Sequence, residues 1–121
     1  MCKLIACICI VTLLTSCGGN SSTPSIDGKW NEVYSFPGNS LNFTLSTQNT
    51  AVSGTGSYVG EAGPQGNLTV TGTYQPPSVN LSILYDNGVT YTFVGTVPDS
   101  NHMNGQMTYS SSTPTAVSFV R

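Results

Sequence analysis

The chain contains few side chains that could carry out acid–base, nucleophilic or metal chemistry. His102 is its only histidine, and Asp99 is the only carboxylate near it in the sequence. A zinc site uses three or four protein ligands, so this pair is at most a fragment of one, and we interpret His102 as an exposed turn residue. Asp27, Glu32 and Glu61 have no evident partner for general acid–base work, and the serines lack a base beside them. The sequence therefore predicts no catalytic residue, no metal site, no cofactor and no enzyme activity.

Cys17 is the one residue with an expected chemical fate. Residues 1–16 begin with a short positive segment, and an apolar run follows over residues 4–14. That run is too short to span a bilayer core, which needs about 20 residues, and it has the length of the hydrophobic part of a signal peptide. Leu14-Thr15-Ser16-Cys17 resembles the lipobox of bacterial lipoproteins, in which an aliphatic residue and two small residues precede a cysteine. An ordinary secretory cleavage at the same place would put Leu14 where a small residue is required.

The lipobox resemblance implies how the protein is held in the cell. It implies cleavage before Cys17, lipid on the thiol and amine of this cysteine, and firm attachment to a membrane, since several acyl chains anchor better than one. Cys17 would be the only cysteine left after cleavage, because Cys2, Cys7 and Cys9 lie in the removed segment. In such lipoproteins a glycine rather than an aspartate at the next position, here Gly18, favours the outer membrane of a Gram-negative cell. We expect the protein in the cell envelope, on the periplasmic face or the surface.

Three segments are expected along the chain: a lipoprotein signal peptide at 1–16, the lipidated cysteine with a flexible tether at 17–25, and one folded domain at 26–121. From residue 17 onward the chain has two basic residues, Lys29 and Arg121, and five acidic ones, so its net charge is 2 − 5 = −3. Nucleic-acid binding depends on neutralising phosphates with basic side chains, so we expect no nucleic-acid partner. The expected partners are a membrane and a small ligand or envelope partner.

Apolar and polar residues alternate with a period of two from residue 26 onward, which indicates strands with one buried face. Eight strands are expected, at 26–36, 41–47, 52–59, 67–74, 79–85, 89–97, 103–109 and 115–121. An open sheet of eight short antiparallel strands would have two bare edges, and pairing the first strand with the last removes them. The predicted fold class is all-β, a closed up-and-down barrel of about eight antiparallel strands.

The turn at Asp86-Asn87-Gly88 fixes the register of one hairpin. A two-residue loop would place the apolar residues of the two strands on opposite faces of the sheet. A three-residue loop, with Gly88 in a left-handed conformation as a bulge, pairs Tyr85 with Val89 and places all these apolar residues on one face. We predict the three-residue loop.

The first and last strands carry a resemblance to calycins, the group that includes lipocalins and avidins. Gly28-Lys29-Trp30 resembles their first-strand Gly-x-Trp signature, and Arg121 ends the last strand on its inward phase. The resemblance implies that Arg121 packs over Trp30 and closes the floor of the barrel. The chain departs from avidins, which line their biotin site with several tryptophans, because Trp30 is its only one. It also has no room for the helix that precedes the last strand of lipocalins.

Five tyrosines are expected at the end of the barrel opposite the tether, which we call the rim. Odd-numbered strands should run from floor to rim, so their last inward residues lie at the rim, and the sixth strand starts there. The rim tyrosines are Tyr34, Tyr58, Tyr85, Tyr91 and Tyr109. Tyrosine suits a barrel end because its ring can be buried while its hydroxyl stays wet. Alternatively, the rings form a stacking platform for a small planar, sugar-like or peptide ligand.

Six glycines lie on the inward phase: Gly28, Gly54, Gly56, Gly72, Gly95 and Gly105. They either allow the sharp coiling that a narrow barrel needs or leave a hollow inside it.

The function expected from these observations is that of a membrane-anchored cell-envelope lipoprotein whose barrel binds a small ligand or an envelope partner without catalysis. A structural or surface-coat lipoprotein is one alternative. The other is a protease-inhibitor-like barrel, in which the segment from Ser21 to Ile26 enters a protease cleft.

Overall fold

The computed structural model describes residues 23–33, 40–60 and 65–121. Cys17, Tyr34 and Glu61 lie outside the described residues, and so do the predictions made for them. The described residues form the strands β1 (Gly28–Val33), β2 (Ser40–Gln48), β3 (Ala51–Val59), β4 (Gln65–Gln75), β5 (Ser78–Tyr85), β6 (Thr90–Asp99), β7 (His102–Tyr109) and β8 (Thr115–Val120).

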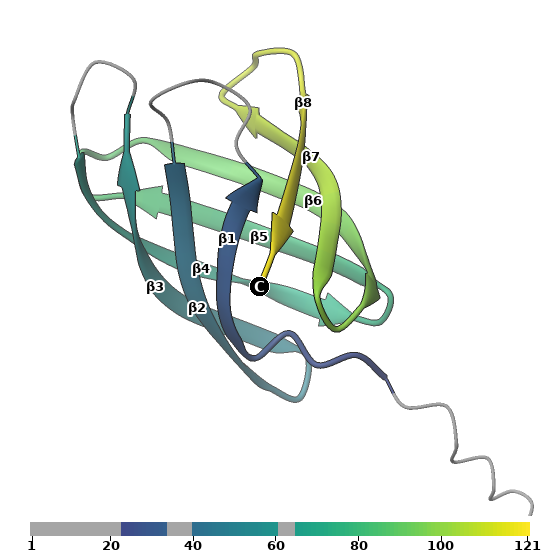
Figure 1. Cartoon of the computed structure of the whole chain (residues 1–121). Coiled ribbons are helices and arrows are strands. Elements are labelled where there is room, and N and C mark those ends of the chain that lie inside the picture. The colour runs from purple at the N-terminus through teal and green to yellow at the C-terminus, as the bar shows by residue number, and fades with distance from the viewer. Residues whose placement is uncertain (1–22, 34–39, 61–64) are drawn as a thin grey trace, which may run out of the picture.

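The eight strands form a closed antiparallel barrel in sequence order (Figure 1). Each strand pairs with the next, and β1 pairs with β8 from Asn31↔Val120 to Val33↔Ser118. This pairing removes both sheet edges, as the edge argument requires. The predicted fold class is therefore confirmed, and it is compatible with a calycin-like barrel. Among the described residues, no helix is long and apolar enough to cross a membrane.

Large buried side chains from several strands meet in the floor half of the barrel. Trp30, Phe43, Phe93 and Phe119 are completely buried. The ring of Phe119 lies 4.8 Å from that of Phe43 and 5.2 Å from that of Phe93, measured between centroids, within the range of favourable aromatic pairs. This half of the barrel is a packed interior.

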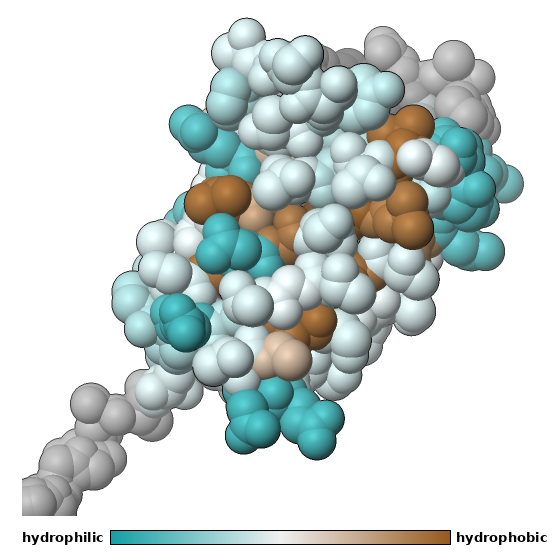
Figure 2. Space-filling model, turned by 180° about the vertical axis from the view of Figure 1, so that it is seen from behind, coloured by the Kyte–Doolittle hydropathy of each residue, from teal (hydrophilic) through white to brown (hydrophobic). Residues whose placement is uncertain are grey.

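The residues that alternate with the buried ones along each strand form the outer surface of the barrel. Figure 2 shows it mostly as pale residues of intermediate hydropathy, with apolar side chains in scattered patches. The large apolar side chains exposed there include those of Val33, Val59, Leu84 and Val94.

The inward glycines on β3, β4, β6 and β7 let neighbouring strands approach closely. A Cβ at Gly95 would overlap the backbone carbonyl oxygen of Asn104, and one at Gly105 would overlap that of Val94. Gly95 and Gly105 are register partners, so neither strand has a side chain at this point of the β6–β7 pair. Gly54, Gly56 and Gly72 are crowded by backbone in the same way. These five glycines serve the tight coiling of a small barrel rather than a hollow.

The hairpin between β5 and β6 has the three-residue loop predicted for it. The Tyr85 N–H donates to the Val89 carbonyl at 2.8 Å, and the Gly88 N–H donates to the Tyr85 carbonyl at 3.0 Å. Gly88 has φ +93°, in the region that side chains disfavour. This pattern is a turn followed by a glycine bulge, so the predicted register is confirmed.

The floor is closed by Trp30 and Arg121, as the resemblance to calycins implies. The guanidinium carbon of Arg121 lies 4.6 Å from the centroid of the Trp30 ring, in the geometry of a cation–π contact. The guanidinium also donates to the backbone carbonyls of Ser25, Asp27 and Ser100. Arg121 thus joins the start of β1, the end of β8 and the β6–β7 turn.

The chain segment before β1 is fastened to this floor. Ile26 is completely buried and accepts a hydrogen bond of 2.8 Å from the Trp30 indole N–H. The Tyr74 hydroxyl donates to the Pro24 carbonyl at 2.7 Å. Pro24 and Ser25, the last residues of the predicted tether, therefore have backbone carbonyls that are hydrogen-bonded to the barrel.

Candidate functional site

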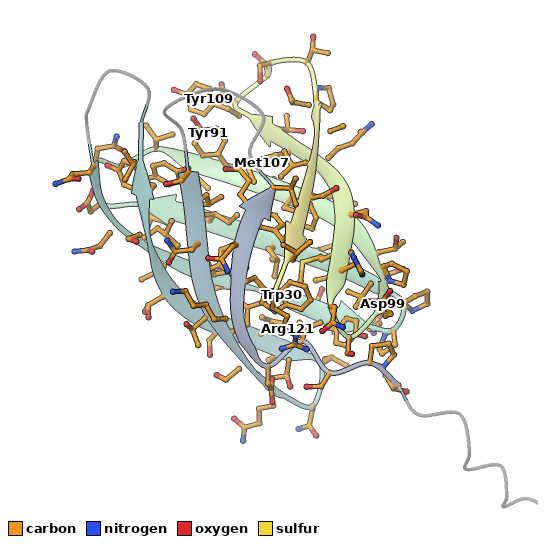
Figure 3. The ribbon with its side chains drawn as sticks, in the orientation of Figure 1. Trp30, Tyr91, Asp99, Met107, Tyr109 and Arg121 are labelled. Carbon is orange, nitrogen blue, oxygen red and sulfur yellow. The ribbon has the colours of Figure 1, made fainter. Side chains whose placement is uncertain are left out.

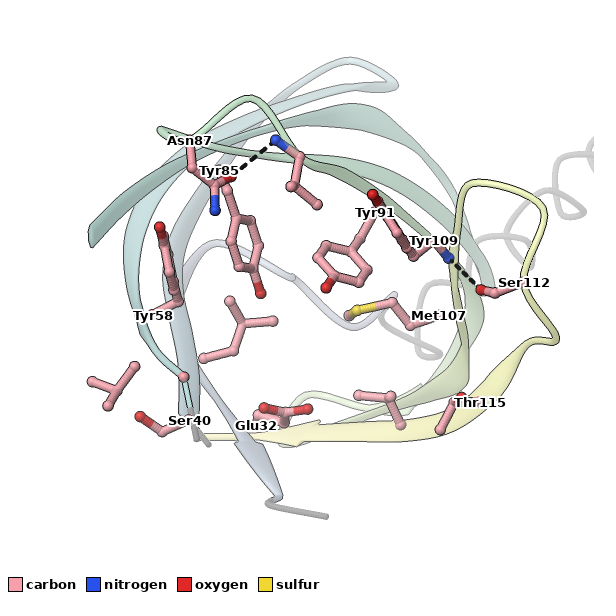
Figure 4. Close-up of a pocket in the computed structure, with 15 residues that line it drawn as sticks. Glu32, Ser40, Tyr58, Tyr85, Asn87, Tyr91, Met107, Tyr109, Ser112 and Thr115 are labelled. Carbon is pink, nitrogen blue, oxygen red and sulfur yellow. Dashed lines mark hydrogen bonds between the residues drawn. The ribbon is translucent and has the colours of Figure 1, made fainter. Parts of the chain in front are cut away.

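A cavity of about 460 Å³ opens at the rim, at the end opposite Trp30 and Arg121 (Figures 3 and 4). Side chains of Glu32, Leu41, Tyr58, Tyr85, Tyr91, Met107, Tyr109 and Val117 are among those that line it. The interior is thus filled at the floor, while the rim half is hollow.

Four of the five predicted rim tyrosines form a continuous row of rings around the opening. Ring centroids lie 4.1 Å apart for the stacked pair Tyr58–Tyr85, 5.0 Å for Tyr85–Tyr91 and 5.3 Å for Tyr91–Tyr109. Strand parity explains the row, because Tyr58, Tyr85 and Tyr109 lie at or near the ends of β3, β5 and β7, and Tyr91 lies at the start of β6. Tyr109 is the register partner of Tyr91 and lines the cavity, and it is 46% exposed at the open end. Tyr34, the fifth, lies outside the described residues.

One end of this row is held by the carboxylate of Asp86. It accepts a hydrogen bond of 3.0 Å from the Tyr58 hydroxyl and one of 2.9 Å from the Asn67 N–H. These two bonds lower the pKa of Asp86, with the Asn67 N–H contributing most. Gly66 makes the arrangement possible, because a Cβ there would press on the Asp86 carboxylate. The turn sequence around Asp86 gave no sign of its hydrogen bond with Tyr58, because the two residues lie far apart in the chain.

Glu32 is the functional candidate that sequence reasoning missed. It lies two residues after Trp30 on β1, pairs with Phe119 of β8 and lines the cavity. Burial raises the pKa of its carboxyl group, because the charged form loses hydration there. The sequence did contain one indication of its position: Glu32 is two residues from Trp30 on the same strand, so both side chains point inward.

Glu32 faces two of the tyrosines across the cavity. In Figure 4 the hydroxyl ends of Tyr85 and Tyr91 point into the opening from one wall, and the Glu32 carboxylate stands on the opposite wall. Burial raises the pKa of Tyr85, and the nearby Tyr91, Glu32 and Tyr58 raise it further. Three oxygen-bearing groups thus converge on one apolar-walled space. Such a space, with a few polar groups directed into it, is typical of a small-molecule site.

His102 and Asp99 lie far from this cavity, at the floor, where they flank the turn between β6 and β7. The His102 Nδ1 is 2.8 Å from an Asp99 carboxylate oxygen, and both side chains are 54% exposed. The pKa of Asp99 is lowered, chiefly by this contact and next by the N–H of Asn101. The expected exposure of His102 is confirmed, although His102 is the first residue of β7 and directly follows the turn. Across the described ranges, no group of three or more His, Cys, Asp and Glu side chains could hold a metal ion.

No model of a known protein family matches the chain, and no curated protein matches it.

Proposed function

We propose that the protein is a lipid-anchored protein of the cell envelope whose barrel binds a small ligand in the rim cavity and does not catalyse a reaction. The rim cavity itself carries the proposal. Its volume of about 460 Å³ falls within the range of about 300–1,000 Å³ that small-molecule sites occupy. A barrel that served only as a scaffold would gain stability by filling this space, as its floor half does.

The proposed anchor is supported by the lipobox-like segment that ends at Cys17. The orientation of the barrel relative to the membrane is inferred from where residues 23–27 lie. Residues 23–27 lie at the floor end, beside Trp30 and Arg121, whereas Tyr91 and Tyr109 lie at the other end (Figure 3). A tether that leaves from the floor would direct the rim cavity away from the membrane. A ligand could then enter from the solution.

Binding without catalysis is proposed because the groups inside the cavity suit recognition. Among the described lining residues, Glu32 is the only acid and no histidine accompanies it. Asp86, the nearest other carboxylate along the row of rings, is already engaged by Tyr58 and Asn67. Burial raises the pKa of Tyr58 and Tyr85, so their hydroxyls keep their protons near neutral pH.

A binding screen with two tyrosine variants tests the proposal. Envelope glycans, small lipids and small aromatic compounds would be titrated into the full chain, with the Met107 ε-methyl resonance as a reporter in the cavity. Tyr85→Ala should weaken any ligand found by about tenfold, because a ring that lines the cavity is lost. Tyr74→Phe is the matched control, since Tyr74 lies at the floor and contacts Pro24. Equal weakening by both variants, or no ligand in any class, would contradict the proposal.

A structural or surface-coat role is the second candidate. The stacked pair of Tyr58 and Tyr85 favours it, because these rings already cover each other's faces. The protease-inhibitor alternative has less support, since Ile26 is buried and the carbonyls of Pro24 and Ser25 are bonded to the floor. These residues could not enter a protease cleft without leaving the barrel.

A further inference from the structure

The charge of the rim cavity restricts the ligands that it can hold. Glu32 is the only charged side chain among its described lining residues. The chain's only Lys and Arg residues are Lys3, Lys29 and Arg121. Lys29 is exposed on the outward phase of β1, and Arg121 is bound at the floor. The described part of the cavity therefore has a negative charge with no basic side chain beside it, which disfavours an anionic ligand.

The cavity offers acceptors to a ligand: the Glu32 carboxylate only accepts, and the tyrosine, serine and threonine hydroxyls can accept as well as donate. The carboxylate of Glu32 and the hydroxyls of Tyr85 and Tyr91 face one another across the opening (Figure 4). A group with several N–H donors and a positive charge complements such a set, and its hydrogen bonds to a carboxylate are of the strong, charge-assisted kind.

A metal ion fits these acceptors poorly. Calcium takes six to eight oxygen ligands, usually with several carboxylates, and magnesium requires a near-octahedral set. Glu32 alone supplies a carboxylate here, and the described chain contains no cluster of metal-ligating side chains. Part of the cavity wall is apolar, since Leu41, Met107 and Val117 line it. They would contact a carbon skeleton, and aromatic rings also attract cations.

The structure assigns the rim cavity to an organic cation, an amine whose ammonium group binds Glu32 and the hydroxyls of Tyr85 and Tyr91 while its apolar part contacts the rings and Met107. This assignment rests on the proposed binding function and names the class of ligand. Glu32 is partly buried, so its charged form has lost part of its hydration, and a bound ammonium group would compensate that cost. A neutral sugar would contact the same rings but would leave the Glu32 charge uncompensated.

Three compounds of nearly the same shape separate charge from shape: phenethylamine, 2-phenylethanol and phenylacetate. Each would be titrated into the full chain in a non-ionic detergent and followed by the ε-methyl resonances of Met107, in the cavity, and Met103, in the floor. We expect the amine to bind at least tenfold more tightly than the alcohol, and phenylacetate to bind more weakly than both. The Met107 resonance should shift while that of Met103 stays in place.

Two variants that each remove one negative charge test the role of Glu32. Glu32→Gln should weaken phenethylamine binding at least tenfold and leave 2-phenylethanol binding unchanged. Asp99→Asn is the matched control at the exposed floor turn, and it should change neither. Thermal unfolding of each variant shows whether it is folded.

A pH titration of the unmodified chain gives a second measurement that needs no variant. Phenethylamine binding should weaken as the pH falls through the raised pKa of Glu32, while 2-phenylethanol binding stays constant. The other titratable groups along the described rim are Tyr58, Tyr85, Tyr91, Tyr109 and Asp86. The pKa values of Tyr58 and Tyr85 are raised by burial, so these phenols stay protonated over this range, and Asp86 stays ionised because its pKa is lowered.

The outcomes separate this inference from the function on which it rests. If the alcohol or a methyl glycoside shifts Met107, Tyr85→Ala abolishes that shift, and Glu32→Gln has no effect on the amine, then the cavity binds ligands and the cation assignment is wrong. If no cationic, neutral or anionic probe shifts Met107, both the cation assignment and the proposed binding function are wrong.

Discussion

Glu32 carries the only charge among the described lining residues of the rim cavity, and its inward position follows from strand geometry. Residues two apart on a strand point to the same face, so Glu32 points inward as Trp30 does. Acidic residues are seldom buried, which makes an inward glutamate an exception to the alternation. What the sequence could not show is the cavity, which lets this carboxylate remain partly hydrated. Whether an inward acid is tolerated depends on that space, and the space depends on how all eight strands pack.

The free energy of unfolding should show how much stability is lost by placing the charged Glu32 carboxylate at the cavity wall. Its pKa is raised in the folded chain, so its contribution to stability is fully present below the unfolded pKa of about 4.3 and is lost as the pH rises through the folded value. Glu32→Gln should therefore stabilise the protein near pH 7 by roughly 0.5 kcal/mol, a small value because water in the cavity screens the charge. The difference should vanish near pH 4.

Urea unfolding of both proteins at pH 4 and pH 7 measures this difference. Asp99→Asn is the contrasting variant, because the pKa of Asp99 is lowered. Its stabilising contribution is present above the unfolded pKa of about 3.9 and is lost at lower pH. That substitution should lower stability at pH 7. A Glu32→Gln protein less stable than the original chain at pH 7 would contradict the desolvation argument.

The β5–β6 hairpin offers a test at the scale of one element. Gly88 has φ +93°, and a Cβ built there meets nothing within 4 Å, so a substitution would be limited by backbone conformation alone. Gly88→Val should destabilise the protein by about 1–2 kcal/mol, because a β-branched residue disfavours this region. Gly88→Asn should cost less, since asparagine tolerates left-handed conformations. Thermal unfolding of both variants measures the difference, and equal costs would refute the bulge as the reason for glycine.

The elements were the part of the fold that the sequence predicted best. All eight strands were found from the alternation, and the hairpin register followed from Asp86-Asn87-Gly88. The tight turn between β2 and β3 was not identified, although Asn49 has φ 59° there. Its sequence, Asn49-Thr50, lacks the glycine or proline that marks the other turns. Residue pairing across a barrel fixes such a turn, so local sequence alone indicates it weakly.

At the scale of the whole molecule, strand parity separates two ends with different properties. The floor gathers Trp30 and Arg121, and the rim gathers the row of tyrosines, as the sequence predicted. The cavity could not be predicted in the same way. Tyrosine rings at a barrel end can meet in the centre and fill it, or stand along the wall and leave it open. The choice depends on barrel width, which the close strand approach at Gly95 and Gly105 helps to set, and no local pattern records that width.

The anchor is a property of the whole chain, and its prediction concerns Cys17. Lipid transfer needs the thiol, so Cys17→Ser should abolish labelling by a palmitate analogue and leave the precursor uncut. Cys9→Ser is the matched control, because it alters a cysteine of the predicted signal peptide and should leave labelling intact. The Cys17→Ser chain should still fold and retain the rim cavity, because the Arg121 contacts that close the floor begin at Ser25. Label on the Cys17→Ser chain, or none on the original chain, would exclude the anchor and leave the binding proposal to stand on the cavity alone.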